Sequence, residues 1–466
     1  MVGAGPNGLT AAVTLARAGR SVLVLEAADT IGGGARSGAL TLPGFTHDLC
    51  SSVHPLGATS PVFTRLPLAE HGLRWRHADV PLAHPLDGGR AAVLHRSLPA
   101  TADGLSADGP AWTRLMGPLV RAWDDVTAHL EHPVRLPRHP VALGRSGLRA
   151  LRSAGGLAGG AFDDEPARAL FAGLAGHAVL PFDVAGTAGF GLVLAGGAHT
   201  VGWPLAEGGS QAIVDALAAH LRALGGSVQT GHAVRRLADV PPCRATLFDV
   251  SPRQLLAIAG DRLSGPYRRA LGRFHHGPGV CKVDWALDGP VPWTAAACRG
   301  AGTVHVGGHL EEIAAAEEAV GRGEHPERPF VLVVQASVAD PTRAPAGQHT
   351  LWAYCHVPNG STVDVTERIE RQIERFAPGF RDRVLARVTR TAADMEGDNA
   401  NYIGGDIAGG AHTLRQIAAR PAPRLRPHRT SNPALLLCSA STPPGAGVHG
   451  LCGYHAARSA LTGVLR

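Results

Sequence analysis

The stretch Gly3-Ala4-Gly5-Pro6-Asn7-Gly8 is a G-x-G-x-x-G motif that lies almost at the start of the chain. In such a motif the first glycine allows a tight turn from strand to helix. The second lets the backbone approach a pyrophosphate, and the third lets the helix pack closely on the sheet. The N–H groups and the positive dipole end of the following helix attract phosphate. Gly3, Gly5 and Gly8 are therefore predicted to bind a dinucleotide.

The residues that follow extend this motif. Glu26 ends the apolar run at residues 22–25, at the position where an acidic side chain accepts hydrogen bonds from the adenosine ribose and disfavours a 2′-phosphate. A second glycine cluster comes directly behind it. We expect its Gly33 and Gly34 to contact the cofactor and Arg36 to add positive charge at the phosphates. The combination favours a binding site over a plain glycine-rich turn without a ligand.

The composition is that of a soluble globular protein with two or three domains. The chain has 466 residues, of which 45% are hydrophobic and 18% are charged. It has no apolar stretch long enough to span a bilayer and no room for a signal peptide before Gly3, so we expect a cytoplasmic protein. Its seven cysteines form no C-x-x-C and its 24 histidines form no H-E-x-x-H, which argues against a disulfide oxidoreductase and against a metal site.

The formal net charge is +6, but the sequence contains no nucleic-acid-binding module. The densest basic stretch is residues 262–276, which includes Arg268, Arg269 and Arg273. We interpret this stretch as a solvated helix face. The alternative is a peripheral contact with an anionic membrane surface.

The hydrophobic pattern predicts an alternation of strands and helices. We expect a helix at residues 11–19, a strand at 21–26, a loop-rich segment at 45–75 and mostly helices at 110–200. The turn Glu207-Gly208-Gly209-Ser210 is expected to start a helix that ends at Gly225-Gly226. Further strands are expected at 227–237 (a β-pair), 245–250, 280–287, 304–307, 330–337, 350–357 and 435–438, with a helix capped by Thr366 at 366–376 and a last helix from about 451.

This order predicts an α/β fold with a Rossmann-like cofactor domain assembled from discontinuous segments. These segments are residues 1–75, 205–260 and 395–466, while 76–204 and 261–394 are expected to form an α+β substrate domain from a helical insertion and a second sheet. Only Met1 and Val2 precede the first turn, whereas a central strand usually has five or six residues, so we expect the first strand to begin upstream of residue 1.

A second glycine-rich turn lies near the other end of the chain. Residues 435–453 have the pattern of strand, turn and helix again, without G-x-G-x-x-G spacing. A helix N-terminus here is suited to the edge of an isoalloxazine ring, where reduction builds negative charge. We expect Ser441, Gly447 and Val448 to contact the cofactor. The alternative is a plain turn before a surface helix.

Taken together, these motifs resemble the phytoene desaturase-like branch of the flavin amine oxidase superfamily. More closely, they resemble the FAD-dependent oxidoreductase group related to pyridine nucleotide-disulphide oxidoreductase domain-containing proteins. The matching elements include both glycine turns, the segment 207–210 and Asn401-Tyr402-Ile403-Gly404-Gly405-Asp406. The resemblance implies FAD as the cofactor and places Val234 on a strand near its adenine. Many members carry an acidic residue before the last turn, where this chain has Ser439-Ala440, so that backbone or Ser441 must hold the cofactor there.

The resemblance implies hydride transfer from a substrate to flavin N5, as in desaturation or dehydrogenation. We expect a small apolar or amphipathic substrate because the helical insertion is rich in Leu, Ala and Gly and poor in charge. No second dinucleotide motif is present, so the expected electron acceptor is oxygen, a quinone or another protein. A flavin amine oxidase, a redox-neutral polyene isomerase and a non-enzymatic flavoprotein that binds a partner remain as alternatives.

Lys282 is the first catalytic candidate because it is the chain's single lysine among 44 Lys and Arg residues. It lies on an alternating strand, on which Asp284 and Ala286 share its face. Lysine offers a compact ammonium whose pKa shifts readily on burial. In the related amine oxidases a lysine on the substrate-domain sheet holds a water near flavin N5, and the resemblance implies this role for Lys282. The alternative is a chance surface lysine, or one paired with Asp284.

His449 is the second catalytic candidate because the last turn is expected to abut the flavin. His54, Tyr354, His356 and Tyr402 lie in loops or strand ends that are placed to line a cleft, although each residue of this kind more often has a structural role. We interpret Cys452 as a buried thiol rather than a covalent attachment point for the flavin.

Overall fold

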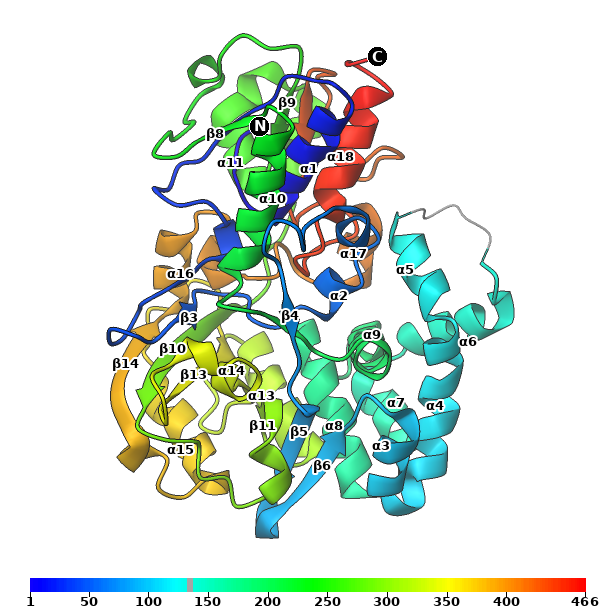
Figure 1. The fold of residues 1–466 in the computed structure, drawn as a ribbon. Helices are drawn as coiled ribbons and strands as arrows, with labels where there is room; N and C mark the ends of the chain where they lie inside the picture. Colours follow the sequence, from blue (N-terminus) through cyan, green and yellow to red (C-terminus); the bar gives the residue numbers. More distant parts are fainter. Residues whose placement is uncertain (132–136) are drawn as a thin grey trace.

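The computed structural model describes residues 1–131 and 137–466. They form two lobes (Figure 1). The upper lobe in this view contains both ends of the chain, and the lower lobe contains a large sheet with a group of helices at its side. Among the helices of the described residues, none combines the length and the apolar character needed to cross a bilayer.

A parallel sheet forms the core of the upper lobe. β1 (Leu23–Leu25) pairs with β8 (Ser227–Gln229), and β9 (Thr246–Phe248) pairs with β15 (Leu435–Leu437). Val2 joins the two pairs through parallel bridges to Leu25 and Phe248. Segments from the start, middle and end of the chain therefore lie side by side in one sheet.

Helices α1 (Pro6–Arg17), α10 (Gln211–Ala223) and α18 (Leu451–Leu461) pack around this sheet, and α11 (Pro252–Ala259) and α12 (Gly265–Gly272) complete the lobe. An ideal Cβ at Gly8 would lie 2.1 Å from the carbonyl oxygen of Gly3. One at Gly453, on α18, would lie 1.8 Å from the carbonyl oxygen of Asn7. Both glycines are required because α1 approaches its own turn and α18 too closely for a side chain.

The lower lobe is built on a seven-stranded sheet with the order β14-β10-β13-β12-β11-β5-β6. Neighbouring strands are antiparallel, except that β5 and β11 run parallel. Every residue of β10 is buried because one face of the sheet packs on the helical insertion and the other on α15. The bounds are β5 (Val80–Leu86), β6 (Arg90–Leu94), β10 (Gly279–Leu287), β11 (Ala301–Val306), β12 (Val331–Val334), β13 (His349–Val357), β14 (Val384–Arg390), α13 (Leu310–Gly321) and α15 (Thr366–Phe376).

The helical insertion packs through small residues. An ideal Cβ at Gly196 would lie 2.7 Å from the Trp123 ring, and one at Gly191 would lie 3.0 Å from the Phe171 ring. These glycines let large aromatic side chains fill the spaces between helices. The helices are α3 (Leu98–Gly104), α4 (Gly109–Arg121), α5 (Trp123–Glu131), α6 (Pro140–Ala150), α7 (Ala154–Ala161), α8 (Glu165–Ala175) and α9 (Thr187–Thr200).

Short elements connect the two lobes. β2 (Ser37–Gly38) pairs with β3 (His47–Asp48), and β4 (Trp75–Arg76) pairs with β7 (Leu205–Ala206), both antiparallel. Four short helices lie near these connections: α2 (Pro55–Ala58), α14 (Ala336–Ala339), α16 (Ala392–Asp398) and α17 (Leu414–Ala419).

Three sequence predictions about local structure were wrong in detail. The first helix begins at Pro6, with Gly5 as its N-cap, and not at residue 11. The expected β-pair at 227–237 is only the strand β8, because Gly231 has a φ of +66° and the Asp239 carboxylate holds the following backbone in a turn. Thr366 does not cap α15: it is the first helical residue, and its N–H donates to the Asp364 carboxylate. The predicted domain boundaries stay a prediction.

Candidate functional site

The first glycine turn is a cradle of bare backbone. Gly3 and Gly33 have φ values of +96° and +54°, which favour glycine. An ideal Cβ at Gly33 would lie 3.2 Å from the Cα of Gly5, so the two glycine segments meet without a side chain between them. The start of α1 lies at the same place, and the positive dipole end of this helix suits a phosphate, although the Gly8 N–H donates to Asp249. The residues present therefore fit the phosphates of a dinucleotide.

Glu26 follows β1 directly and is half-buried. Its Oε2 accepts the N–H of Ala4 at 2.7 Å, and its Oε1 accepts the N–H of Ala28 at 3.0 Å. An ionised carboxylate has about four lone-pair sites, so acceptor capacity remains for ribose hydroxyls. Its position fits the predicted contact with the ribose, which stays a prediction.

The second glycine cluster is closed by the segment that carries Tyr402. An ideal Cβ at Gly34 would lie 1.9 Å from the Tyr402 hydroxyl oxygen, so a larger residue has no room there. Arg36 donates from Nε to the Gly33 carbonyl at 3.0 Å and from Nη2 to the Asp398 carbonyl at 2.8 Å. Arg36 is therefore fixed beside the glycines by backbone groups of both segments.

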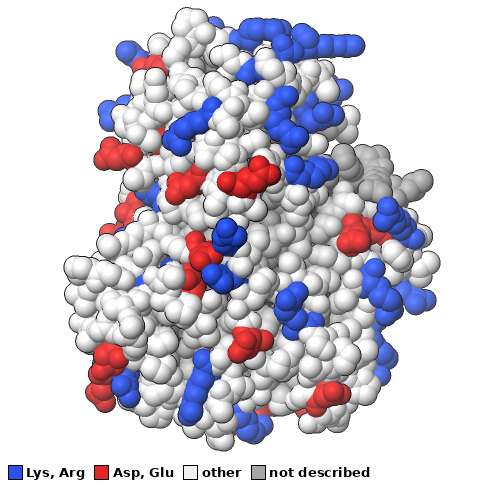
Figure 2. Space-filling model, viewed as in Figure 1, with Lys and Arg blue, Asp and Glu red and all other residues white. Residues whose placement is uncertain are grey.

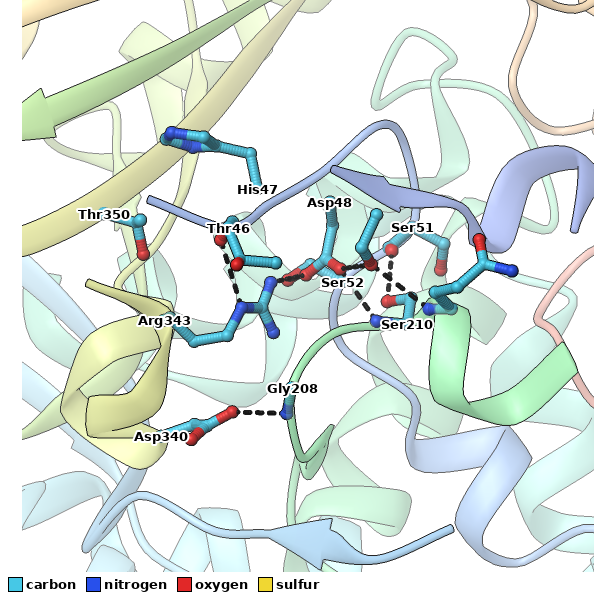
Figure 3. A network of polar contacts seen from close by, with 12 residues as sticks. Thr46, His47, Asp48, Ser51, Ser52, Gly208, Ser210, Asp340, Arg343 and Thr350 are labelled. Atoms are coloured by element: carbon cyan, nitrogen blue, oxygen red, sulfur yellow. Dashed lines mark hydrogen bonds and ion pairs between the residues drawn. The ribbon is translucent and has the colours of Figure 1, made fainter. Parts of the chain in front are cut away.

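A buried ion pair joins this region to the large sheet (Figure 3). Arg343 Nη2 lies 2.6 Å from Asp48 Oδ2, and both side chains are 1% exposed. Asp48 also accepts hydrogen bonds from the hydroxyls of Ser37 and Ser52 and from the N–H of Ser210. Burial acts to raise the pKa of Asp48, but Arg343 and these hydrogen bonds outweigh it and lower the pKa to about 2. Asp48 is therefore ionised throughout the physiological range.

The turn before α10 is held from both lobes by the same network. The N–H of Gly208 donates to Asp340 Oδ2 at 2.7 Å, and the N–H of Ser210 donates to Asp48 Oδ1 at 2.8 Å. His54 Nε2 lies 2.8 Å from the Ser210 hydroxyl, and burial lowers the pKa of His54 to about 4, so this histidine is neutral. The segment 207–210 thus has a structural role: it carries the N–H groups that bind two carboxylates.

Lys282 lies on β10 with its side chain 1% exposed and in an ion pair with Asp284. It shares a sheet face with Val280, which packs on the helical insertion. Burial lowers the pKa of Lys282, and Asp284 opposes this shift. Asp284 also lies 3.5 Å from Arg390 Nη1 and 3.7 Å from His47 Nδ1. The lysine is therefore not a surface residue.

Two aromatic residues of β13 complete the surroundings of this lysine. Tyr354 pairs with Lys282 in the register of β10 and β13, and Trp352 pairs with Asp284. Lys282 Nζ lies 5.5 Å from the centre of the Trp352 ring, within cation–π range. The rings of Trp352 and Tyr354 are T-shaped, with centroids 5.2 Å apart. Both rings belong to the apolar cluster formed with the helical insertion.

Contacts lead from the glycine turn to this lysine. The N–H of Ser51 donates to the Gly34 carbonyl. Burial raises the pKa of the Cys50 thiol, while a hydrogen bond with Tyr402 and the charge of Lys282 oppose the rise. Cys50 lies in the apolar cluster that contains Trp352 and Tyr354, and Tyr402 packs against the same cluster.

The C-terminal glycine turn brings the predicted residues together, but its contacts favour structural roles. Ser441 is buried, and Gly447 and Val448 have φ values of +136° and +53°. His449 Nδ1 accepts the N–H of Leu451, the first residue of α18, and burial lowers the pKa of His449 to about 4. The catalytic role of His449 stays a prediction that these contacts do not favour.

Cys452 and Val234 differ in how well they fit the predictions. The Cys452 thiol donates to the carbonyls of Thr442 and Gly445, and burial raises its pKa to about 11, which makes it an unreactive buried thiol as interpreted. Val234, by contrast, was expected on a strand. It lies in the loop after β8 and packs against the cluster that contains Phe248, because β8 ends at Gln229.

Sequence reasoning missed four buried polar residues of this region: His47, Asp48, Asp249 and Arg343. Asp249 had a detectable signal, since it is an acidic residue at the carboxyl end of the strand predicted at 245–250, and ligands bind at the carboxyl ends of parallel strands. Asp48 and Arg343 had no such signal in the sequence, because a contact between residues so far apart does not affect the local pattern of hydrophobic residues.

Comparison with known proteins agrees with this geometry. Residues 1–66 match the model of the NAD(P)-binding Rossmann-like domain. The chain is 28% identical to pyridine nucleotide-disulfide oxidoreductase domain-containing protein 2 of Mus musculus, over 98% of this chain and 92% of that protein. The chain is a homologue of this oxidoreductase.

Two solved structures share the fold along the whole chain. An oxidoreductase from Methanosarcina mazei matches with a TM-score of 0.66 and 17% identity, over 99% of each chain. Cyclohexylamine oxidase from Brevibacterium oxydans matches with a TM-score of 0.60 and 16% identity, over 99% of this chain and 98% of that one. These matches confirm the predicted α/β fold of the flavin amine oxidase type, with a Rossmann-like N-terminal part.

Replacing Arg343 by methionine should destabilise the protein strongly. Methionine keeps the bulk of the apolar stem but leaves Asp48 buried without its cation, which costs about 3–5 kcal/mol in the free energy of unfolding. The control is Arg322→Met, whose ion pairs with Glu318 and Glu324 are exposed and should contribute little. Urea unfolding followed by circular dichroism measures both variants, and equal midpoints would contradict the role given to the buried pair.

Proposed function

We propose that the chain binds FAD and oxidises a small apolar or amphipathic substrate by hydride transfer, in the manner of a desaturase or dehydrogenase. The observation that carries the proposal is the position of Lys282. It is buried beside the Trp352 ring of an apolar cluster that also contains Cys50. Tyr402 packs against the same cluster, and its hydroxyl meets Gly34 of the dinucleotide turn. FAD, when bound, supplies the hydride acceptor at N5. Oxygen, a quinone or another protein then takes the electrons.

Lys282 has the donors needed to hold a water or oxygen molecule. An ammonium group has three N–H donors, and Asp284 is the hydrogen-bond acceptor that the described residues supply. The remaining donors can hold a small molecule beside the rings of Trp352 and Tyr354. Asp284 stabilises the charge of the ammonium, and the apolar cluster excludes bulk water.

The nature of the substrate follows from the lining of this region. The cluster that contains Trp352 and Tyr354 is otherwise built from aliphatic and aromatic side chains of the helical insertion. Such a surface favours an apolar or amphipathic molecule over a charged one. Oxidation of a small amine is the second candidate, because the aromatic pair and the buried Asp284 lie together beside Lys282.

The purified protein should be yellow, and the cofactor released on denaturation should be FAD. Gly5→Val should abolish binding, because the side chain would enter the place where the backbone approaches the pyrophosphate. Gly144→Val is the matched control, because Gly144 lies in α6, has no positive φ, and an ideal Cβ there meets nothing within 4 Å. Absorption spectra after reconstitution measure both, and a parent protein that takes up no FAD would overturn the proposal.

Lys282→Met should leave FAD bound and slow one half-reaction. Methionine keeps the bulk of the stem and removes the ammonium, so a loss of tenfold or more in the oxidative half-reaction is expected, about 1.4 kcal/mol in barrier. Lys282→Arg should not restore the rate, because a guanidinium is broader and remains charged. Stopped-flow mixing with oxygen measures this step, and a parent-like rate in both half-reactions would contradict the role of Lys282.

The same instrument separates the two substrate classes. Anaerobic mixing with a series of polyenes and long-chain alkenes should bleach the flavin absorbance, whereas primary amines of similar length should not. Bleaching by amines alone would replace the first candidate by the second.

We also propose a peripheral contact with an anionic membrane surface through α12 and the segment 414–432. The two pack together, since Gln416 bonds to the backbone of His275 and Ser431 to that of Ser264. Leu425 is fully exposed between Arg424 and Arg426, and residues 407–466 contain no Asp or Glu. Lys and Arg side chains also gather over the upper lobe in Figure 2, so the exposed apolar residues distinguish this surface rather than charge alone.

Sedimentation with lipid vesicles tests this contact. The protein should bind vesicles that contain phosphatidylglycerol better than vesicles of phosphatidylcholine alone. Leu425→Ser combined with Arg268→Ala should weaken binding, whereas Arg222→Ala with Arg235→Ala, which lie outside α12 and the segment 414–432, should not. Equal recovery of all forms with both lipids would rule the contact out.

A further inference from the structure

A buried carboxylate lies against the dinucleotide turn. Asp249 follows β9 directly, and β9 lies beside Val2 in the sheet, so Asp249 meets Gly3. Asp249 Oδ2 accepts the N–H of Gly8 at 2.8 Å, and an ideal Cβ at Gly5 would lie 2.8 Å from the same oxygen. Only 9% of the residue is exposed. An anionic acceptor thus occupies the end of α1 that otherwise offers N–H groups to phosphate.

The surroundings supply no cation for this carboxylate among the described residues. Glu26, after β1, adds negative charge, and the thiols of Cys438 and Cys452 are kept neutral because burial raises their pKa values. The Met1 amine donates its hydrogen bond to the Leu23 carbonyl. Burial raises the pKa of Asp249 to about 7; the Gly8 N–H opposes this rise and Glu26 adds to it.

We propose that Asp249 is a positioning residue for the dinucleotide that takes up one proton when the dinucleotide binds. The inference rests on the proposed binding of FAD. A pyrophosphate brings negative charge to the N-terminus of α1, where an ionised Asp249 would repel it. When the carboxyl takes a proton from the solvent, one oxygen still accepts the N–H of Gly8. The other becomes an O–H donor, which a phosphate oxygen can accept.

This proton uptake makes the affinity for FAD depend on pH, with a defined sign. The bound state favours the protonated carboxyl, so binding strengthens as the pH falls. Below the pKa of about 7 the group already carries its proton and the affinity is constant. Above it, the dissociation constant should rise about tenfold per pH unit, because each binding event must then draw a proton from the buffer.

Isothermal titration of the apoprotein with FAD tests the proposal at about pH 6 to about pH 8.5. At each pH the titration is repeated in two buffers with different ionisation enthalpies, which counts the protons taken up. We expect an uptake that approaches one proton per FAD near the upper end of the range and falls toward zero at the lower end.

Two variants isolate the group. Asp249→Asn keeps the shape and the acceptor for Gly8 but cannot titrate, so it should bind FAD without proton uptake, with a constant affinity, and more tightly than the parent near pH 8. The exposed Asp261→Asn should behave as the parent does. A parent protein that binds FAD without proton uptake, or an Asn variant with the parent's pH dependence, would overturn the role of Asp249 alone. A parent that binds no FAD at any pH would overturn the proposed cofactor as well.

Discussion

The buried ion pair between Asp48 and Arg343 fixes how the two halves of the site face each other. The partners are 295 residues apart in the chain, and neither β3 nor the short turn that carries Arg343 is long enough to be stable alone. Removing two charges from water is costly, and the attraction repays this only if the remaining hydrogen-bonding groups are satisfied. For Asp48 the hydroxyls of Ser37 and Ser52 and the Ser210 N–H supply those partners, and Arg343 Nε donates to the Thr46 carbonyl. The pair therefore holds β3 in place, and Cys50, two residues further on, lies in the apolar cluster that contains Trp352 and Tyr354.

Two other buried carboxylates, those of Asp284 and Asp249, differ in whether a cation lies beside them among the described residues. Asp284 has Lys282 and Arg390 beside it, so its charge is balanced within the large sheet. His47 also lies close to it, but burial lowers the pKa of His47 to about 3, so it adds no charge. Asp249 has only an N–H donor and lies near another acid. A structural carboxylate is stabilised by a nearby cation. A buried carboxylate without a cation, at a place where an anion binds, permits that binding only when it is protonated and therefore neutral. The surroundings of the two carboxylates thus favour a structural role for Asp284 and the proposed titrating role for Asp249.

The sequence predicted those features that local pattern determines. Gly8 is required by its contact with the Gly3 carbonyl, five residues earlier, and Gly33 by its φ of +54° in the turn. The alternation at Lys282 depends only on the period of a strand. The cap of α15 was assigned to Thr366 because a threonine at a helix start is a good cap. However, Asp364, two residues earlier, takes its N–H, and propensity does not decide between two such neighbours. Val234 was misplaced because a strand pattern continues past Gly231, where only the positive φ and the Asp239 turn reveal the loop. The hydrogen-bond network around Asp48 could not be predicted from the sequence, because its members come from distant segments of the chain.

The nearby Arg390 bears on the role of Lys282, the chain's single lysine. Arg390 Nη1 lies 3.5 Å from Asp284 Oδ2, so a positive charge is already available to this carboxylate. If charge alone were needed, a chain that otherwise uses arginine throughout would have no reason to place a lysine at the same carboxylate. Lysine differs by its compact head, its donors that point in three directions and a pKa that burial lowers. Lys282 Nζ lies 5.5 Å from the centre of the Trp352 ring, in an ion pair with Asp284. A lysine beside Arg390 thus adds hydrogen-bond donors at a carboxylate that already has a cation, which supports the proposed role of residue 282 in holding a small molecule.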